Sequence, residues 1–253
     1  MPKFSKREVL NQMVLLIDIG NTQIKTARFS GRKILPGKML PVYPVTGKKI
    51  GDLLGDSSVC VCSSVVPEAT KILRKVCRRK KIKFRLFGRK DVKKISIKYK
   101  KPEKIGSDRL ATILGAASIS PAPFIVVDMG TAVTCELVNK QKEYIGGIIF
   151  PGIELCIKSL NEKTALLPSV KFKRVPGNIG RNTAECISKG IYNAVTAGIE
   201  KSVNGFGRIA PGAAVFLTGG GVKYFSRRDF NFTFRKDELL VFRGLLQLYK
   251  KLV

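Results

Sequence analysis

The chain has 253 residues, of which 44% are hydrophobic and 26% charged, a composition typical of a globular protein with one large domain or two smaller lobes. It contains no histidine, which excludes Ser-His-Asp triads, His-ligated zinc and every imidazole acid or base. Any general base must be a carboxylate, Lys, Tyr or Cys, and enzymes so restricted often act on phosphates. The net charge of +29 calls for an anionic partner or a strongly solvated surface.

The N-terminal half is predicted to alternate strands and helices. Residues 1–12 are polar and basic and form a predicted extension before the first strand, unless Met13 is the true start. Pro67 at a first helical position and Glu68 in the first turn signal the start of a helix. The predicted elements of this half are strands over 13–18, 23–29, 33–42, 57–64 and 81–86, and helices over 67–80 and 107–118.

The pattern restarts after the segment Pro121–Pro123. Strands are predicted over 124–128, 133–139, 144–150 and 213–217. IDIGNT at 17–22 and VDMGTA at 127–132 share one order: an apolar strand, an Asp at its end, a Gly turn, a Thr and the next strand. This repeat predicts an α/β protein made of two duplicated lobes, 13–120 and 121–253, each of which turns one carboxylate and one glycine turn toward a cleft.

Both turns carry residues that suit a phosphate and its metal ion. Gly20 lets the backbone approach a phosphate, and Asp18 can hold magnesium or its water. Asp128, Gly130 and Thr131 offer the same groups in the second half. A third glycine turn, Thr218–Gly221, follows the strand over 213–217, where a nucleotide could lie against bare backbone. Each turn taken alone is also compatible with a purely structural role.

Basic residues concentrate in one segment. Residues 71–109 hold 18 Lys+Arg and 3 Asp+Glu, so +15 of the net charge lies there. The segment can be a solvated face, can attract small anions, or can bind nucleic acid. Few aromatic residues lie in it and no helix-turn-helix, zinc-finger or RNP pattern accompanies it, so nucleic-acid binding has the least support.

The six cysteines and the short apolar runs predict a cytoplasmic protein. No CxxC occurs and four of the cysteines lie inside apolar runs, which indicates buried thiols in a reducing compartment rather than disulfides. No apolar stretch approaches the ~18 residues that a membrane span needs. The run from Met13 to Ile17 is too short for a signal peptide.

The two-lobed pattern resembles the superfamily of acetate and sugar kinases, Hsp70 and actin. That resemblance implies two similar lobes of the actin-like ATPase (ribonuclease H-like) fold, each a mixed sheet flanked by helices, with a cleft between them. Within the superfamily the chain is similar to the type III pantothenate kinases from about residue 13 to its end, including its tail over 240–249. The motifs that carry this likeness, in order, are SSVVP (63–67), GSDR (106–109), VDMGTAVT (127–134), YIGGIIFPG (144–152), TALLP (164–168) and IGRNTAE (179–185).

The resemblance implies transfer of the ATP γ-phosphate to the primary hydroxyl of pantothenate, giving 4′-phosphopantothenate in the first step of coenzyme A synthesis. It places the proton acceptor, or general base, on Asp108. A hydroxyl nucleophile does need a nearby carboxylate in a chain without histidine. Arg109 could fork onto the pantothenate carboxylate. The alternative for Asp108, the N-cap of the helix that begins there, stays open at this point.

The resemblance also implies the remaining site residues. It assigns a monovalent cation, K⁺ or NH₄⁺, to Asp128, with Mg²⁺ accompanying ATP. It implies a homodimer in which Thr183 acts on the neighbouring protomer, while Tyr99 could equally be an exposed tyrosine in a basic loop. ATP contacts fall on Asp18, Ile19, Gly20, Asn21, Thr22, Gln23, Ile24, Lys25 and Thr131, and pantothenate contacts on Tyr99, Gly106, Ser107, Asp108, Arg109 and Thr183.

Two features depart from the family pattern. Ser107 stands where the family has Ala, and its hydroxyl is expected to hydrogen-bond pantothenate or Asp108. The basic segment 71–109 is the other departure, and it supports an alternative hypothesis of a non-catalytic, nucleic-acid-associated relative. The three carboxylates Asp18, Asp108 and Asp128 argue against a retired kinase. A kinase of the same superfamily with another acceptor is the third hypothesis.

Overall fold

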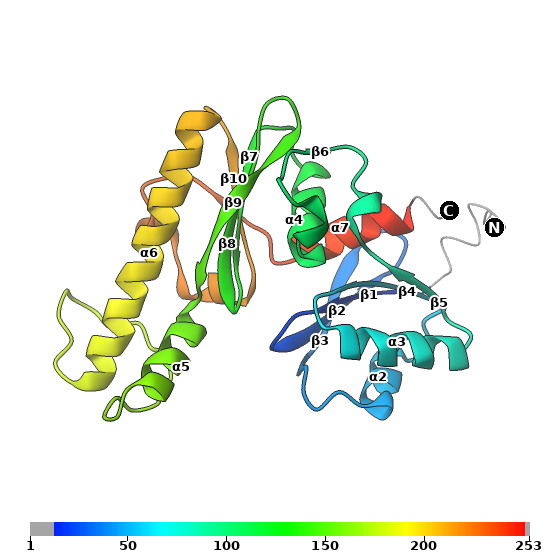
Figure 1. Cartoon of the computed structure of the whole chain (residues 1–253), viewed down its shortest axis with the longest axis horizontal. Helices are drawn as coiled ribbons and strands as arrows, with labels where there is room; N and C mark the ends of the chain where they lie inside the picture. The colour runs from blue at the N-terminus through cyan, green and yellow to red at the C-terminus, as the bar shows by residue number, and fades with distance from the viewer. Residues whose placement is uncertain (1–12, 251–253) are drawn as a thin grey trace. The chain divides into compact units, whose positions relative to one another are not determined.

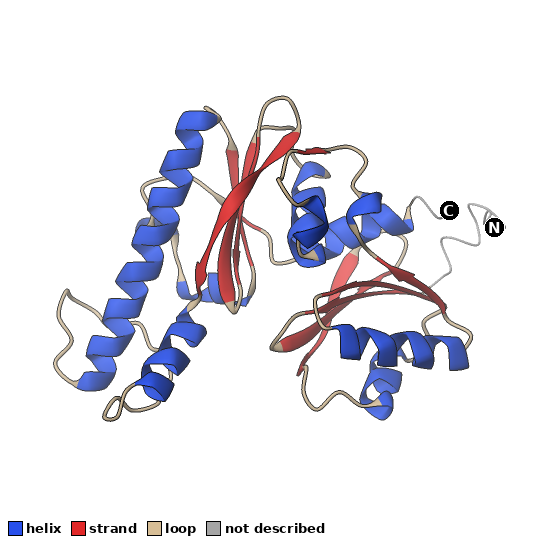
Figure 2. Ribbon diagram, in the orientation of Figure 1, coloured by secondary structure: helices blue, strands red, loops and turns tan. Residues whose placement is uncertain are grey.

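The computed structural model describes residues 13–250. The predicted extension over 1–12 lies outside the described residues. Contacts divide the described residues into two compact units, of which unit 1 comprises 13–121 and 239–250 and unit 2 comprises 122–238 (Figures 1 and 2). No helix among the described residues is long and apolar enough to cross a membrane.

Unit 1 is built on a five-stranded mixed sheet in the order β3-β2-β1-β4-β5. The central strand β1 pairs antiparallel with β2 and parallel with β4. It is an apolar run buried on both faces, as a strand covered by helices on both sides must be. The strands are β1 (Val14–Ile19), β2 (Gln23–Phe29), β3 (Ile34–Pro41), β4 (Val59–Ser64) and β5 (Lys83–Leu86), and a short strand β6 (Ser96–Ile97) follows.

Helices cover both faces of this sheet (Figure 1). The helices α2 (Gly47–Leu54) and α3 (Pro67–Arg79) lie on one face, and α4 (Ser107–Ala117) and α7 (Leu240–Tyr249) lie on the other. Two glycines allow α4 and α7 to touch backbone to backbone, because a Cβ at Gly115 would overlap the Leu240 carbonyl and a Cβ at Gly244 would overlap the Ala111 carbonyl. This contact places the last helix of the chain in unit 1.

Unit 2 repeats the same arrangement. Its strands follow the order β11-β10-β7-β8-β9, and β7 pairs antiparallel with β8 and parallel with β10. The correspondence to unit 1 runs strand for strand, which confirms the predicted duplication and the α/β fold class. The elements are β7 (Phe124–Met129), β8 (Ala132–Val138), β9 (Glu143–Pro151), α5 (Ile153–Lys163), α6 (Thr183–Ile209), β10 (Ala214–Thr218) and β11 (Arg235–Lys236).

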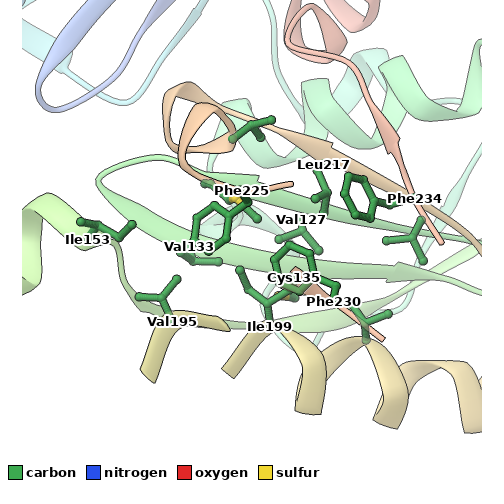
Figure 3. Close-up of a cluster of buried hydrophobic side chains, with 14 of the residues drawn as sticks. Val127, Val133, Cys135, Ile153, Val195, Ile199, Leu217, Phe225, Phe230 and Phe234 are labelled. Atoms are coloured by element: carbon green, nitrogen blue, oxygen red, sulfur yellow. The ribbon is translucent and has the colours of Figure 1, made fainter. Parts of the chain in front are cut away.

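One hydrophobic core holds unit 2 together. Side chains from α6, such as Val195 and Ile199, meet the inner face of the sheet at Val127 and Cys135 (Figure 3). The aromatic residues Phe225 and Phe230 close the same cluster from the segment after β10. Burial raises the pKa of the Cys135 thiol to about 12.

Four of the six cysteines lie in the cores, as their apolar surroundings predict. Cys60, Cys62, Cys77 and Cys135 are buried and unbridged, while Cys156 is half-buried and Cys186 exposed. The predicted strands and helices are found with ends shifted by one or two residues. The sequence analysis assigned no helix to 47–54, 153–163 or 183–209, where α2, α5 and α6 form.

Candidate active site

The first glycine turn joins β1 to β2 in unit 1. The Gly20 N–H donates to the Gln23 carbonyl at 3.0 Å, which closes the turn. Asn21, Thr22 and Gln23 are exposed. Ile19 and Ile24 are fully buried, so these two assigned ATP contacts can offer a nucleotide only their backbone groups.

Strand register puts Asp18 beside a second polar residue. Asp18, near the end of β1, is aligned with Ser63 of β4 and with Lys25 of β2. Adjacent strands lie about 4.8 Å apart, so the Asp18 and Ser63 backbones are direct neighbours. Both residues stand at the carboxyl end of parallel strands, the edge where ligands bind in α/β sheets.

The hydroxyl of Ser107 ties the start of α4 to this edge. Its Oγ lies 3.1 Å from the Ser63 Oγ, accepts a hydrogen bond from the Ser64 N–H at 3.1 Å and donates to the Ser64 carbonyl at 3.1 Å. We expected this hydroxyl to bond pantothenate or Asp108. In the structure it bonds the end of β4 instead, because the first turn of α4 sits directly on that strand end.

Asp108 lies in the first turn of α4 and is half-buried. The N-cap of the helix is Gly106, so the N-cap interpretation of Asp108 is wrong. One carboxylate oxygen, Oδ1, accepts the Arg109 N–H at 2.8 Å. A Cβ at Gly106 would overlap this oxygen, so a glycine is required there for the carboxylate to keep its place. Through Ser107, the candidate base is held at the strand edge that carries Asp18.

Two further predicted substrate residues meet beside Asp108. The Arg109 guanidinium lies over the Tyr99 ring, 5.8 Å from its centroid. A cation over an aromatic face is attracted to it, which restricts where the guanidinium can go. Gly106, Ser107, Asp108, Arg109 and Tyr99 therefore form one continuous group in unit 1.

The second glycine turn joins β7 to β8 in unit 2. The Gly130 N–H donates to the Ala132 carbonyl at 3.0 Å, and the Gly152 N–H donates to the Thr131 carbonyl at 3.0 Å. Asp128 is aligned with Thr218 of β10. Asp128 and Thr218 thus occupy the positions that Asp18 and Ser63 occupy in unit 1, each pair being a carboxylate beside a hydroxyl on a parallel neighbour.

The late glycines lie directly against Asp128. Gly219 has a φ of +89°, and a Cβ there would overlap both the Asp128 carboxylate and the Met129 carbonyl. A Cβ at Gly221 would come within 2.9 Å of the Met129 oxygen. Carboxylate and carbonyl oxygens are hard donors that suit K⁺ or Mg²⁺. The residues present therefore fit a cation at this turn.

Thr183 belongs to unit 2. It is the first residue of α6, with an exposed side chain, and Asn182 caps the helix by accepting the Glu185 N–H at 3.0 Å. Two strongly exposed apolar side chains lie near it in sequence, Leu166 at 92% exposure and Ile179 at 79%.

The sequence analysis assigned no role to Ser63 and Ser64. The available signal was the pair of hydroxyls that ends the apolar run VCVCSS, because polar residues at the end of a buried strand face the functional edge of a sheet. Gly219 also gained its specific role only from the structure, where it packs on Asp128.

Comparisons with known proteins agree with one family. Residues 14–205 match the family model of the type III pantothenate kinases. A type III pantothenate kinase from Persephonella marina is 36% identical over 229 residues, covering 82% of this chain and 87% of that protein. Another from Sulfurihydrogenibium sp. is 34% identical over 203 residues, covering 74% and 80%.

Solved structures show the same fold at low sequence identity. A structure described as a conserved putative Baf family transcriptional activator from Campylobacter jejuni has a TM-score of 0.60 and 20% identity, covering 94% of this chain and 98% of that one. The archaeal actin homolog Ta0583 has a TM-score of 0.52 and 13% identity, covering 95% and 100%. The actin-like architecture that the resemblance implied is thereby confirmed.

Proposed function

Because the chain belongs to the type III pantothenate kinase family, a family of enzymes, we propose that it transfers the ATP γ-phosphate to the primary hydroxyl of pantothenate. The product is 4′-phosphopantothenate, in the first step of coenzyme A synthesis. The observation that carries this proposal is the fixed position of Asp108 on the strand edge that also bears Asp18.

Asp108 acts as the general base. One carboxylate oxygen takes the proton of the pantothenate hydroxyl as the hydroxyl oxygen attacks the γ-phosphorus. The bond between that phosphorus and the bridging oxygen breaks, and ADP leaves. Arg109, restrained over Tyr99, binds the pantothenate carboxylate by a charge-assisted hydrogen bond.

The two glycine turns bind ATP. The exposed residues Asn21 to Gln23 donate to phosphate oxygens in one turn, and Thr131 does so in the other. Asp18 would hold the magnesium ion that accompanies ATP, or one of its waters. That ion neutralises phosphate charge when bound.

Asp128 holds a monovalent cation, K⁺ or NH₄⁺. This assignment is supported by two oxygen donors that lie against Gly219, the Asp128 carboxylate and the Met129 carbonyl.

The chain works as a homodimer in which Thr183 reaches the pantothenate of the neighbouring protomer. Its exposed position and the exposed side chain of Ile179, four residues earlier in the chain, support an interface at this end of α6. Apolar side chains as exposed as this one commonly mark protein contacts when they gather in a patch.

The decisive test is ADP release by the purified chain with magnesium-ATP, with and without pantothenate, in potassium and then in sodium buffer. We expect turnover that depends on pantothenate and is stimulated by potassium. Asp128→Asn should abolish the potassium stimulation, and unchanged stimulation would remove that assignment. A folded chain that binds ATP but shows no turnover with pantothenate would overturn the proposed reaction.

A further inference from the structure

A groove of about 620 Å³ runs along α3 in unit 1. The helix packs against β4 and β5, and the residues that line the groove run from Ser64 at the end of β4 along one side of the helix. Its lining residues are Ser64, Val65, Pro67, Thr70, Lys71, Arg74, Lys75, Arg78 and Leu86. The proposed catalytic and binding residues are absent from that lining, and Ser64 touches them only through its hydrogen bonds to Ser107.

Four cations line this groove at helical spacing. Lys71, Arg74, Lys75 and Arg78 follow i, i+3, i+4, i+7, so they share one face and extend over about 10 Å of helix axis. All four are exposed. Among the described residues none of them forms an ion pair with a carboxylate.

This arrangement opposes the stability of the helix. Lys71 with Lys75, and Arg74 with Arg78, are like charges at i,i+4, which destabilise a helix where opposite charges would stabilise it. The chain does use the stabilising version elsewhere, since Lys158 and Glu162 pair at 3.6 Å on α5. A bound anion between the four cations would remove their repulsion.

The groove also has defined walls. The Arg74 guanidinium is held over the Phe84 ring, 5.8 Å from its centroid. At the inner end, the Thr70 hydroxyl donates to the Ser64 Oγ at 2.7 Å. Val65, Pro67 and Leu86 add apolar surface. A row of cations, one of them held over an aromatic ring, beside apolar walls suits a bound anion rather than a diffuse ion cloud.

We propose that the α3 groove binds a small anion that carries two or more phosphate groups. Its volume lies within the ~300–1,000 Å³ of small-molecule sites. A nucleic-acid strand would need exposed aromatic faces for base stacking, but the Phe84 face is covered by Arg74. Inorganic polyphosphate and nucleotides share the required chemistry, and they differ only in the organic part that the apolar wall would contact.

The test measures the binding of pyrophosphate and of ADP to the full-length chain by titration calorimetry at physiological salt. The groove variant combines Lys71→Ala, Arg74→Ala, Lys75→Ala and Arg78→Ala. The matched control combines Arg79→Ala, Lys90→Ala, Lys93→Ala and Lys94→Ala, which removes the same charge from exposed positions outside the groove. Circular dichroism confirms that both variants fold, and pantothenate-dependent ADP release is measured in parallel.

We expect the groove variant to lose at least about tenfold in pyrophosphate affinity, the effect of one lost charge-assisted contact, and the control to lose less than about twofold. ADP also binds the proposed active site, so the two probes are compared only by the binding that the groove variant loses. A larger loss for ADP than for pyrophosphate, with the difference absent in Leu86→Ser, would identify a nucleotide as the ligand, and equal losses for the two probes would identify inorganic polyphosphate. Equal losses in both variants, or none in the groove variant, would overturn the site. Tight single-stranded oligonucleotide binding that displaces pyrophosphate would overturn it in favour of nucleic acid. The groove residues take no part in the proposed reaction, so kinase activity reports on that proposal separately.

Discussion

The two candidate phosphate turns, one in each unit, use one backbone plan with different supports. In each unit an Asp near the end of the central strand lies beside a hydroxyl residue on a parallel neighbour, Asp18 with Ser63 and Asp128 with Thr218. Unit 1 then secures its site with side-chain hydroxyls, through Ser107. Unit 2 secures its site by close backbone packing at glycines. The same fold therefore tolerates change at the first support more readily than at the second.

The largest expected effect is on catalysis in unit 1. Asp108→Asn removes the proposed base without changing side-chain size, so turnover should fall by about 10²–10⁴-fold. The thermal midpoint should stay close to that of the parent chain. Glu103→Gln, an exposed neutralisation five residues earlier, is the matched control and should leave turnover unchanged. A turnover loss below about tenfold would remove Asp108 from the role of base.

Gly219→Ala tests the glycine packing that supports the turn in unit 2. A Cβ there meets the Asp128 carboxylate at a φ of +89°, so the free energy of unfolding should fall by about 2 kcal/mol or more. Gly220→Ala is the control, because nothing lies within 4 Å of a Cβ at that position and its φ is not in the left-handed region. Denaturant unfolding of both variants measures the difference. Equal stability of the two variants would mean that the glycine packing is not what supports this turn.

Ser107→Ala tests the hydroxyl support of unit 1. It removes the partners of the Ser64 N–H and carbonyl, and the expected cost is about 1 kcal/mol of unfolding free energy, smaller than that of Gly219→Ala. Turnover should fall by no more than about tenfold, since 1.4 kcal/mol corresponds to that factor. Ser118→Ala removes a hydroxyl bond to the Gly115 carbonyl at the other end of α4. A comparable loss of turnover in that control would show that helix stability, not the contact with β4, sets the rate.

The smallest effect concerns an ion pair in unit 2 away from the glycine turn. Burial acts to raise the pKa of Asp229, but hydrogen bonds from Ser226 and Arg174 outweigh it and hold the pKa below its usual value. The stability that this carboxylate contributes is therefore present above its unfolded pKa and is lost as the pH falls through the lower folded value.

Asp229→Asn should consequently lower the thermal midpoint at neutral pH. The expected loss of unfolding free energy is at most about 1 kcal/mol, because the partner Arg174 is exposed to solvent. The difference from the parent chain should shrink once the pH falls below 4. Thermal melts across this range measure it. A difference that persists unchanged at low pH would show that shape, not charge, explains the effect.

Local patterns predicted most of the elements that carry the site. The apolar strands ending in Asp, the glycine turns and the helix start at Pro67 are all short-range signals, and each was found. The long helix α6 was missed although its N-terminus carries a capping pattern, Asn182 followed three residues later by Glu185. Ile187, Ile191, Val195, Ile199 and Val203 recur every four residues, so the apolar spacing typical of a helix was also present in the sequence.

The sequence alone was enough to predict the duplication, the absence of imidazole chemistry and the two carboxylate turns, because these features depend on residue type and spacing. It could not place α7, which packs on α4 through Gly115 and Gly244 although more than 120 residues separate them. Nor could it assign the Ser107 hydroxyl to Ser63 and Ser64, or show Gly219 pressed on Asp128. Such contacts join segments distant in the chain, and their geometry exists only once both sheets have formed and their strands are in register.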